Sequence, residues 1–187
     1  MSDGTILGID LGRRRIGVAI ADVGGLAARP LDTIALPRRT PGAAPAEGAR
    51  AEGTPAEGAP AAGGQAGWDE PALAAIAELV RRHDTRELVV GLPLELRGAE
   101  GEMAAWARDL ANRLRASLGI PVTLRDERLS SSVAEARLGA MPRGRSGGPP
   151  SRTQRERYRA RVDREAAAII LQDELDARRA ARSQMRP

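Results

Sequence analysis

The chain has 187 residues, which is enough for one ordinary domain and too few for two comfortable ones. It contains no cysteine and a single histidine, so disulfides, thiolate metal sites, zinc sites built on imidazoles and triads that need a second histidine are excluded. The formal net charge is +4.

The basic side chains other than that histidine are all arginines, which recognise phosphate with a two-pronged guanidinium group. A coding preference for arginine would give the same composition, so charge alone does not establish a nucleic-acid partner. The remaining oxygen-bearing side chains suit Mg²⁺ or Mn²⁺. The N-terminus lacks the pattern of a signal peptide, and no segment approaches the ~20 apolar residues that span a bilayer. We therefore expect a cytoplasmic protein with no membrane partner.

The first part of the chain predicts three antiparallel strands. An apolar run over residues 5–12 and a second over 15–22 are separated by a tight turn, which indicates a hairpin. Residues 30–36 form a third strand candidate. Residues 38–67 then consist mainly of Ala, Gly, Pro and Glu and lack large apolar side chains, so we expect a disordered insertion with no catalytic role.

The rest of the chain alternates between helical and strand patterns, as parallel crossover units do. We expect a single domain over residues 1–182 with a mixed α/β sheet of five strands, three antiparallel and then parallel, flanked by helices, and a tail at 183–187. The predicted elements are a helix from Asp69, strands at 87–92 and 121–126, a helix at about 100–118, a short helix at 130–140, a basic loop at 141–151 and a long basic helix from about Thr153.

Four acidic residues stand out by position. Asp10 lies inside an apolar strand, where a carboxylate is costly to bury unless it is paired or binds a cation; the alternative is a turn-capping aspartate. Asp126 and Glu127 end the last strand, where open α/β sheets bind ligands; the alternative is a solvated strand end. Asp163 shares a helix face with alanines; the alternative is an ion pair with Arg159 one turn away.

Carboxylates from three separate segments that met at one sheet edge would form a cage for divalent metal ions. Two such ions about 4 Å apart activate water and stabilise the leaving oxygen of a phosphodiester. This chemistry requires neither histidine nor cysteine, which agrees with a sequence that has almost none.

Four segments resemble, in order, the signature blocks of the YqgF family, which is also described as RuvX-like. They are GIDLGRRRIGVAIAD at 8–22, ELVVGLPLELRGAEG at 87–101, DERLSS at 126–131 and VDREAAAIILQDELD at 162–176. The resemblance implies a ribonuclease H-like fold and a metal-dependent endonuclease. It implies a role in ribosome biogenesis, as a pre-16S rRNA nuclease, or in DNA recombination, as a Holliday junction resolvase.

The resemblance also carries catalysis and metal binding onto Asp10, onto the acidic pair Asp126 and Glu127, and onto Asp163. Within the pair we choose Glu127. The expected cofactor is Mg²⁺ or Mn²⁺, held as two ions. We favour precursor rRNA as the nucleic-acid substrate over branched DNA, and the sequence leaves open whether the protein is a monomer or a homodimer.

Two groups of arginines are candidates for binding the nucleic-acid backbone. The first is next to Asp10 in the sequence, and its alternative is a solvated hairpin turn; the second precedes Asp163, and its alternative is a merely solubilising helix face. The residues are Arg13, Arg14, Arg15, Arg143, Arg145, Arg155 and Arg159.

Two other functions remain open at this point. The Asp10-Leu11-Gly12 turn also resembles the first phosphate-binding loop of actin-like ATPases, although those need a second domain and a second loop. The chain is otherwise compatible with a non-catalytic nucleic-acid-binding module, against which the presence of all three acids argues.

Overall fold

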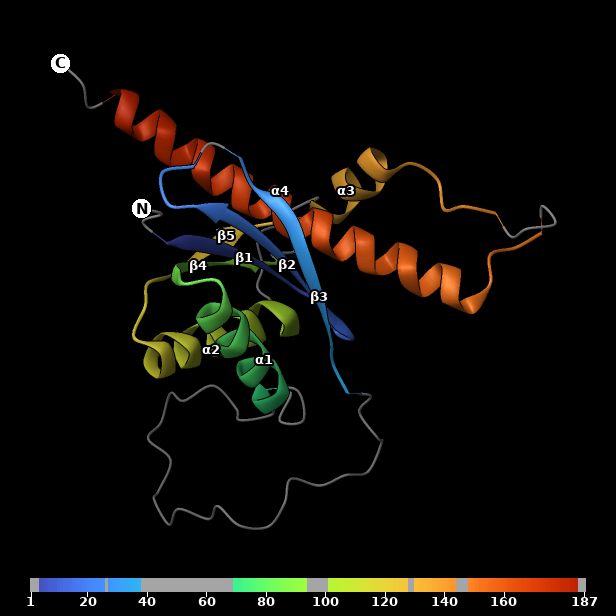
Figure 1. Ribbon diagram of the computed structural model, residues 1–187, viewed down its shortest axis with the longest axis horizontal. Coiled ribbons are helices and arrows are strands. Elements are labelled where there is room, and N and C mark those ends of the chain that lie inside the picture. The colour runs from blue at the N-terminus through green and yellow to red at the C-terminus, as the bar shows by residue number, and fades with distance from the viewer. Residues whose placement is uncertain are drawn as a thin grey trace, which may run out of the picture.

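The central sheet has five strands: β1 Thr5–Leu11, β2 Arg15–Asp22, β3 Arg29–Ala35, β4 Thr85–Leu92 and β5 Val122–Asp126. In the computed structural model they lie in the order β3-β2-β1-β4-β5 (Figure 1). The first three strands pair antiparallel, and β4 and β5 add in parallel to β1. The predicted mixed sheet is confirmed, and its strand order and directions are those of a ribonuclease H-like fold.

The structure describes residues 4–25, 27–37, 69–93, 101–127, 130–143 and 148–184. The predicted insertion at 38–67 lies outside these residues, so its disorder stays a prediction. The limits of the domain at 1–182 and of the tail at 183–187 stay predictions as well. Within the described residues, no helix combines the length and apolar character needed to cross a membrane.

Four helices flank the sheet: α1 Asp69–Arg82, α2 Glu102–Leu118, α3 Ser130–Leu138 and α4 Arg152–Gln184. The first two cover one face, while α4 crosses the other face and carries α3 against its side (Figure 1). With 33 residues, α4 is about 50 Å long at about 1.5 Å per residue. Its first turns, before Ala160, project beyond the sheet (Figure 1).

The two faces of the sheet carry different side chains, because successive residues of a strand point to opposite sides. In β1, Leu7 and Ile9 pack toward α1 and α2 in the larger core, whereas Ile6 packs toward α4 in a second cluster. By the same alternation, Gly8 and Asp10 face α4. The face under α4 is built largely of glycine and alanine, so this helix approaches the backbone closely.

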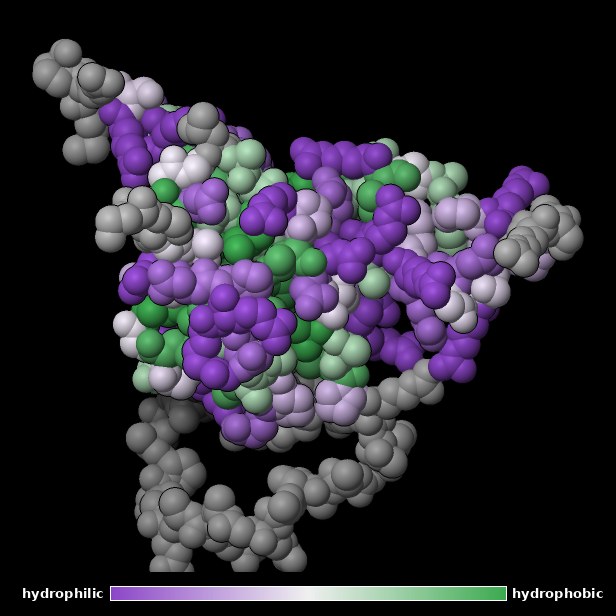
Figure 2. All heavy atoms as spheres, in the orientation of Figure 1, coloured by the Kyte–Doolittle hydropathy of each residue, from purple (hydrophilic) through white to green (hydrophobic). Residues whose placement is uncertain are grey.

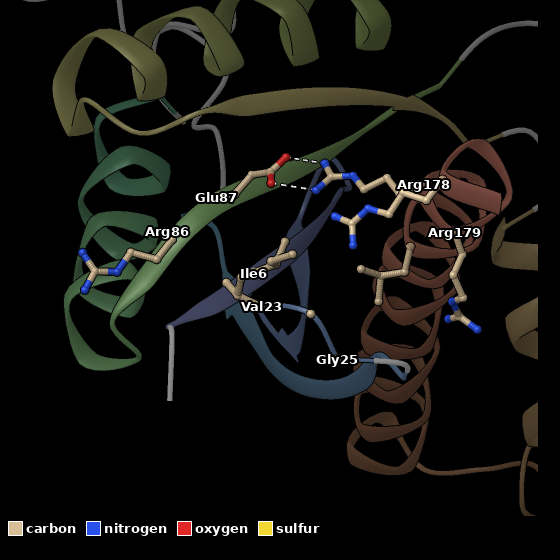
Figure 3. Close-up of a pocket in the computed structure, with 10 residues that line it drawn as sticks. Ile6, Val23, Gly25, Arg86, Glu87, Arg178 and Arg179 are labelled. Atoms are coloured by element: carbon tan, nitrogen blue, oxygen red, sulfur yellow. Dashed lines mark hydrogen bonds and ion pairs between the residues drawn. The ribbon is translucent and has the colours of Figure 1, made fainter. Parts of the chain in front are cut away.

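Two ion pairs tie the C-terminal half of α4 to the sheet and to its own preceding turn. Arg178 Nη1 donates to Glu87 Oε2 at 2.8 Å and Arg178 Nη2 donates to Glu87 Oε1, so Glu87 on β4 reaches across to the helix (Figure 3). Arg178 Nε also donates to Glu174 Oε1 at 2.8 Å, and Thr123 Oγ1 on β5 donates to Glu87 Oε1 at 3.1 Å. These bonds fix how α4 lies on the strands.

The Glu87→Gln variant should lose stability in a pH-dependent way. The hydrogen bond from Arg178 holds the pKa of Glu87 below its usual 4.5, so its stabilisation is present above pH 4.5 and is lost as the pH falls through the lowered pKa. We expect the variant to lose about 2 kcal/mol of unfolding free energy at pH 7, since the hydrogen bonds involve charged groups. Urea unfolding at pH 7, 5 and 3.5 measures the difference.

The matched control is Glu135→Gln, because Glu135 is exposed on α3. This variant should stay within about 0.5 kcal/mol of the original at every pH. Equal unfolding free energies for the original chain and Glu87→Gln at pH 7 would show that the Glu87–Arg178 pair does not hold α4 in place.

Candidate active site

Asp10 lies where α4 comes closest to the sheet. It is opposite Gly17 of β2 in the antiparallel register. A Cβ atom on Gly17 would overlap the backbone carbonyl oxygen of Asp163 on α4, so the helix lies directly on the strand at this point. The absence of a side chain on Gly17 therefore brings Asp163 to Asp10, although 153 positions separate them in the sequence.

Glu127 reaches the same place from the end of β5. Its side chain lies over Gly91 of β4, where an added Cβ would overlap Glu127 Oε2. That oxygen is buried and has no hydrogen-bond partner. Asp126, its neighbour in the acidic pair, is exposed. Of the pair, Glu127 is the one directed at Asp10, and its role as a metal ligand stays a prediction.

Asp163 makes a close ion pair with Arg15, the first residue of β2. Arg15 Nε donates to Asp163 Oδ2 at 2.5 Å, and the two side chains are 24% and 22% exposed. The sequence had suggested Arg159, one helical turn away, as the alternative partner of this carboxylate. The observed partner comes from the other end of the chain.

Burial raises the pKa values of all three carboxyl groups. Burial, with repulsion from Asp163, raises the pKa of Asp10 to about 7 against an opposing hydrogen bond with Glu127. The pKa of Glu127 is raised to about 9, first by burial and then by the charge and hydrogen bond of Asp10 and the charge of Asp126. Burial also raises the pKa of Asp163, but Arg15 opposes the shift. Protons and Arg15 therefore balance charge that a bound cation would otherwise balance.

The chemistry of these side chains fits a hard divalent cation. Carboxylate oxygens are the ligands that Mg²⁺ and Mn²⁺ prefer, and an unpaired buried oxygen on Glu127 is available to one. In the part of the chain that the structure describes, no three acidic or imidazole side chains are close enough together to hold a metal as they stand. Asp163 is turned to Arg15, so binding by all three acids requires that this pair open.

A groove of about 560 Å³ lies between the N-terminal part of α4 and strands β2 and β3. Figure 2 shows hydrophilic side chains over the projecting first turns of the helix, beside a hollow. Arg15 lines the groove and also binds Asp163, so this arginine links the groove to one of the three acids. The lining arginines are Arg14, Arg15, Arg152, Arg155, Arg157, Arg159 and Arg164.

Two other predicted arginines, Arg13 and Arg143, are not brought to this groove. Arg13 turns to the opposite side of the sheet, where its Nη2 donates to Glu102 Oε2 at 3.2 Å on α2. Arg143 is exposed and does not line the groove, and Arg145 lies outside the described residues. Arg164 was not singled out from the sequence. Its place one residue after Asp163 is a signal that could have found it.

A second cavity, of about 300 Å³, lies at the opposite end of the sheet from Asp10. Its lining includes Glu87 and Arg178, which bind each other (Figure 3). Because this pair is already satisfied and fixes α4, we assign the cavity no catalytic role.

Gly91→Ala should displace the Glu127 carboxylate without unfolding the protein. The added methyl group would take the space of Glu127 Oε2, and a flexible side chain gives way more easily than backbone. We expect Mg²⁺ affinity to fall about 10-fold, the lower end of the loss seen when groups that orient metal ligands are removed. Isothermal titration calorimetry measures the affinity, and circular dichroism checks the fold.

The same substitution in a Glu127→Ala background provides the control, because the displaced carboxylate is then missing. There, Gly91→Ala should change Mg²⁺ affinity less than 2-fold, roughly the limit of additivity for independent changes. If Gly91→Ala alone binds Mg²⁺ as tightly as the original chain, Glu127 does not need its position over this glycine.

Comparisons with known proteins show the family to which the chain belongs. The sequence model of a family described as "RuvX: Holliday junction resolvase" matches residues 49–177. A relative from Anaeromyxobacter dehalogenans, named as a proposed pre-16S rRNA nuclease, is 42% identical over 172 residues, which cover 92% of this chain and 96% of the relative. A relative of the same name from Chloroflexus aggregans is 39% identical over 179 residues, covering 96% and 98%.

Among solved structures, RuvC from T. thermophilus in complex with a Holliday junction substrate is similar over 95% of this chain and 96% of its own, with a TM-score of 0.46 and 17% identity. The family match spans more than half of the chain, and relatives near 40% identity cover almost all of it. The chain therefore belongs to the RuvX, or YqgF, family of nucleases.

Proposed function

We propose that this chain is a cytoplasmic endonuclease that cuts precursor 16S rRNA with Mg²⁺ or Mn²⁺ held by Asp10, Glu127 and Asp163. The observation that carries the proposal is the meeting of three largely buried carboxylates, one of which binds an arginine that lines the neighbouring groove. Such a cluster is unfavourable without a cation, and the groove supplies the charge that a phosphate backbone requires.

The reaction is hydrolysis of a phosphodiester. Water adds to phosphorus, the bond from phosphorus to the leaving oxygen breaks, and that oxygen takes up a proton. When bound, divalent ions lower the pKa of water and neutralise charge on the leaving oxygen. Asp10 and Glu127 would hold them from the sheet and Asp163 from α4.

The groove arginines would hold the phosphates on either side of the bond that is cut. Guanidinium groups bind phosphate oxygens through paired, charge-assisted hydrogen bonds. Aromatic residues are only 2% of the chain, so stacking on bases is not available as a major source of affinity. We therefore expect binding that follows the backbone and depends little on base sequence.

The choice of precursor rRNA is supported by the names of the relatives from Anaeromyxobacter and Chloroflexus. The second candidate substrate is a four-way DNA junction, which the family description favours. A junction resolvase needs a symmetric dimer to make paired cuts, whereas a nuclease that trims rRNA can act as a monomer. Side-by-side cleavage of a synthetic 16S precursor and a four-way junction, with the oligomeric state measured by light scattering, distinguishes the two.

We expect Asp10→Asn to fold and to lose at least about 100-fold in cleavage rate. A neutral amide removes one anionic ligand, and groups that stabilise a transition state electrostatically are each worth about 10²–10³ in rate. In EDTA at pH 8 the variant should be at least as stable as the original, because it removes a buried carboxylate that repels its neighbours. Gel assays with Mn²⁺ or Mg²⁺ and thermal melts measure both effects.

Full nuclease activity in purified Asp10→Asn would refute the metal-site assignment. A chain that binds RNA tightly but never cleaves it with either metal would instead be a non-catalytic binding module, which is the alternative left open by the sequence.

Replacing Arg155 and Arg159 with alanine should weaken RNA binding and flatten its salt dependence. Each lost phosphate contact lowers the slope of log affinity against log salt by about 0.7 to 0.9. Mg²⁺ affinity measured without RNA should not fall, because the substitutions remove no ligand and take away the positive charge of Arg159 near Asp163. Fluorescence anisotropy between 50 and 300 mM salt gives the slope.

Arg81→Ala is the control for this experiment, since Arg81 is on α1 behind the opposite face of the sheet and is 72% exposed. Its salt slope should equal that of the original chain. An equal loss of slope in the control and in the double variant would indicate general charge attraction instead of binding in the groove.

A further inference from the structure

Arg15 binds one of the three acids and also lines the groove. Its guanidinium holds Asp163 at 2.5 Å, and its side chain also lines the arginine-rich groove. The ion pair is partly buried, with 24% and 22% of the two side chains exposed, so it is screened less than a surface pair. The same cation therefore faces both the proposed metal ligands and the proposed path of the substrate.

The pair balances charge in the protein without metal. Asp163 and Asp10 repel each other, and the positive charge of Arg15 offsets this repulsion. A divalent cation at Asp163 and the guanidinium of Arg15 compete for the same negative charge, and two adjacent cations repel each other. Metal binding by Asp163 therefore weakens the attachment of Arg15.

A released Arg15 would need another anion. Arginine cannot give up its proton under any ordinary condition, so the charge stays. The groove that Arg15 lines is the route proposed for a phosphate backbone. A substrate phosphate there can accept the guanidinium in place of Asp163, through the paired hydrogen bonds that arginine makes with phosphate.

We propose that Arg15 is exchanged between Asp163 and a phosphate of the nucleic acid, so that metal and substrate each favour binding of the other. This inference rests on the proposed nuclease function and adds to it a coupling between two ligands of one site. The coupling is reciprocal by thermodynamic necessity: if RNA tightens metal binding by some factor, metal tightens RNA binding by the same factor. The protein alone would then hold metal weakly, and the site would be complete only with substrate in place.

The neighbouring Arg14 allows a matched comparison. It lines the same groove and is exposed, but in the described part of the chain the side chain of Asp163 pairs with Arg15 and not with Arg14. Loss of Arg14 should weaken RNA binding without changing the coupling. Loss of Arg15 should weaken RNA binding and also reduce the coupling.

The test measures Mg²⁺ affinity by calorimetry at 150 mM salt, with and without a 12-nucleotide RNA carrying phosphorothioate linkages, which resist cleavage. For the original chain we expect RNA to tighten Mg²⁺ binding about 10-fold, within the range usual for coupled sites. Arg14→Ala should keep this ratio. Arg15→Ala should bind Mg²⁺ alone more tightly than the original and should lose most of the ratio.

A second variant, Arg15→Gln, covers the case in which Arg15→Ala fails to fold, because glutamine keeps much of the side-chain volume and a hydrogen-bond donor to Asp163. It should behave as Arg15→Ala does. If both Arg15 variants keep the original ratio, or if both bind Mg²⁺ alone more weakly than the original, the exchange of Arg15 is wrong while the proposed function stands. If the original chain binds no Mg²⁺ even with RNA, the proposed function itself fails.

Discussion

The close approach of α4 to the sheet is the constraint on which the site depends. Asp163 can meet Asp10 only because Gly17 has no side chain under the helix. In the same way, Glu127 can lie over β4 only because Gly91 has no side chain there. The result is a set of like charges held where water is scarce, which a protein tolerates when protons, arginine or a metal ion balance them.

The two faces of the sheet differ in what they contribute to stability and to the site. The face under α1 and α2 carries large branched side chains such as Ile9 and Val90, which fill a dense core. The face under α4 carries small residues, so the helix backbone lies against the strands. Stability thus comes mainly from one side, and the other side is left free to hold polar groups near the backbone. Arg178 and Glu87 secure the far end of α4, which keeps the helix in the register that Asp163 requires.

The fold could be predicted from the sequence because its signals are local. The hairpin, the strands that flank the helices and the long final helix each follow from hydrophobic period and turn residues. Asp10 and Asp163 could also be singled out, because a carboxylate among apolar or small residues is conspicuous. The choice of Glu127 over Asp126 came from the family resemblance, and the structure adds a reason, since only Glu127 lies over Gly91.

The contacts between distant segments could not be predicted. Arg15 binds Asp163 across 148 positions, whereas sequence spacing suggested Arg159, because helical periodicity shows only neighbours on one helix. Arg13 is next to Arg14 in the chain but turns to α2, since the side of the sheet that each turn residue faces depends on the hairpin geometry. The role of Gly91 depends on a side chain from another strand end, which no pattern around the glycine reveals.

The most direct test of the account is an anomalous diffraction map from crystals of the protein grown with Mn²⁺ and an uncleavable RNA. We predict manganese peaks in contact with the carboxylates of Asp10, Glu127 and Asp163, with the Arg15 guanidinium moved from Asp163 to a phosphate oxygen. Manganese bound elsewhere, with Arg15 still paired to Asp163 and RNA in the groove, would contradict the claim that these three acids form the catalytic metal centre.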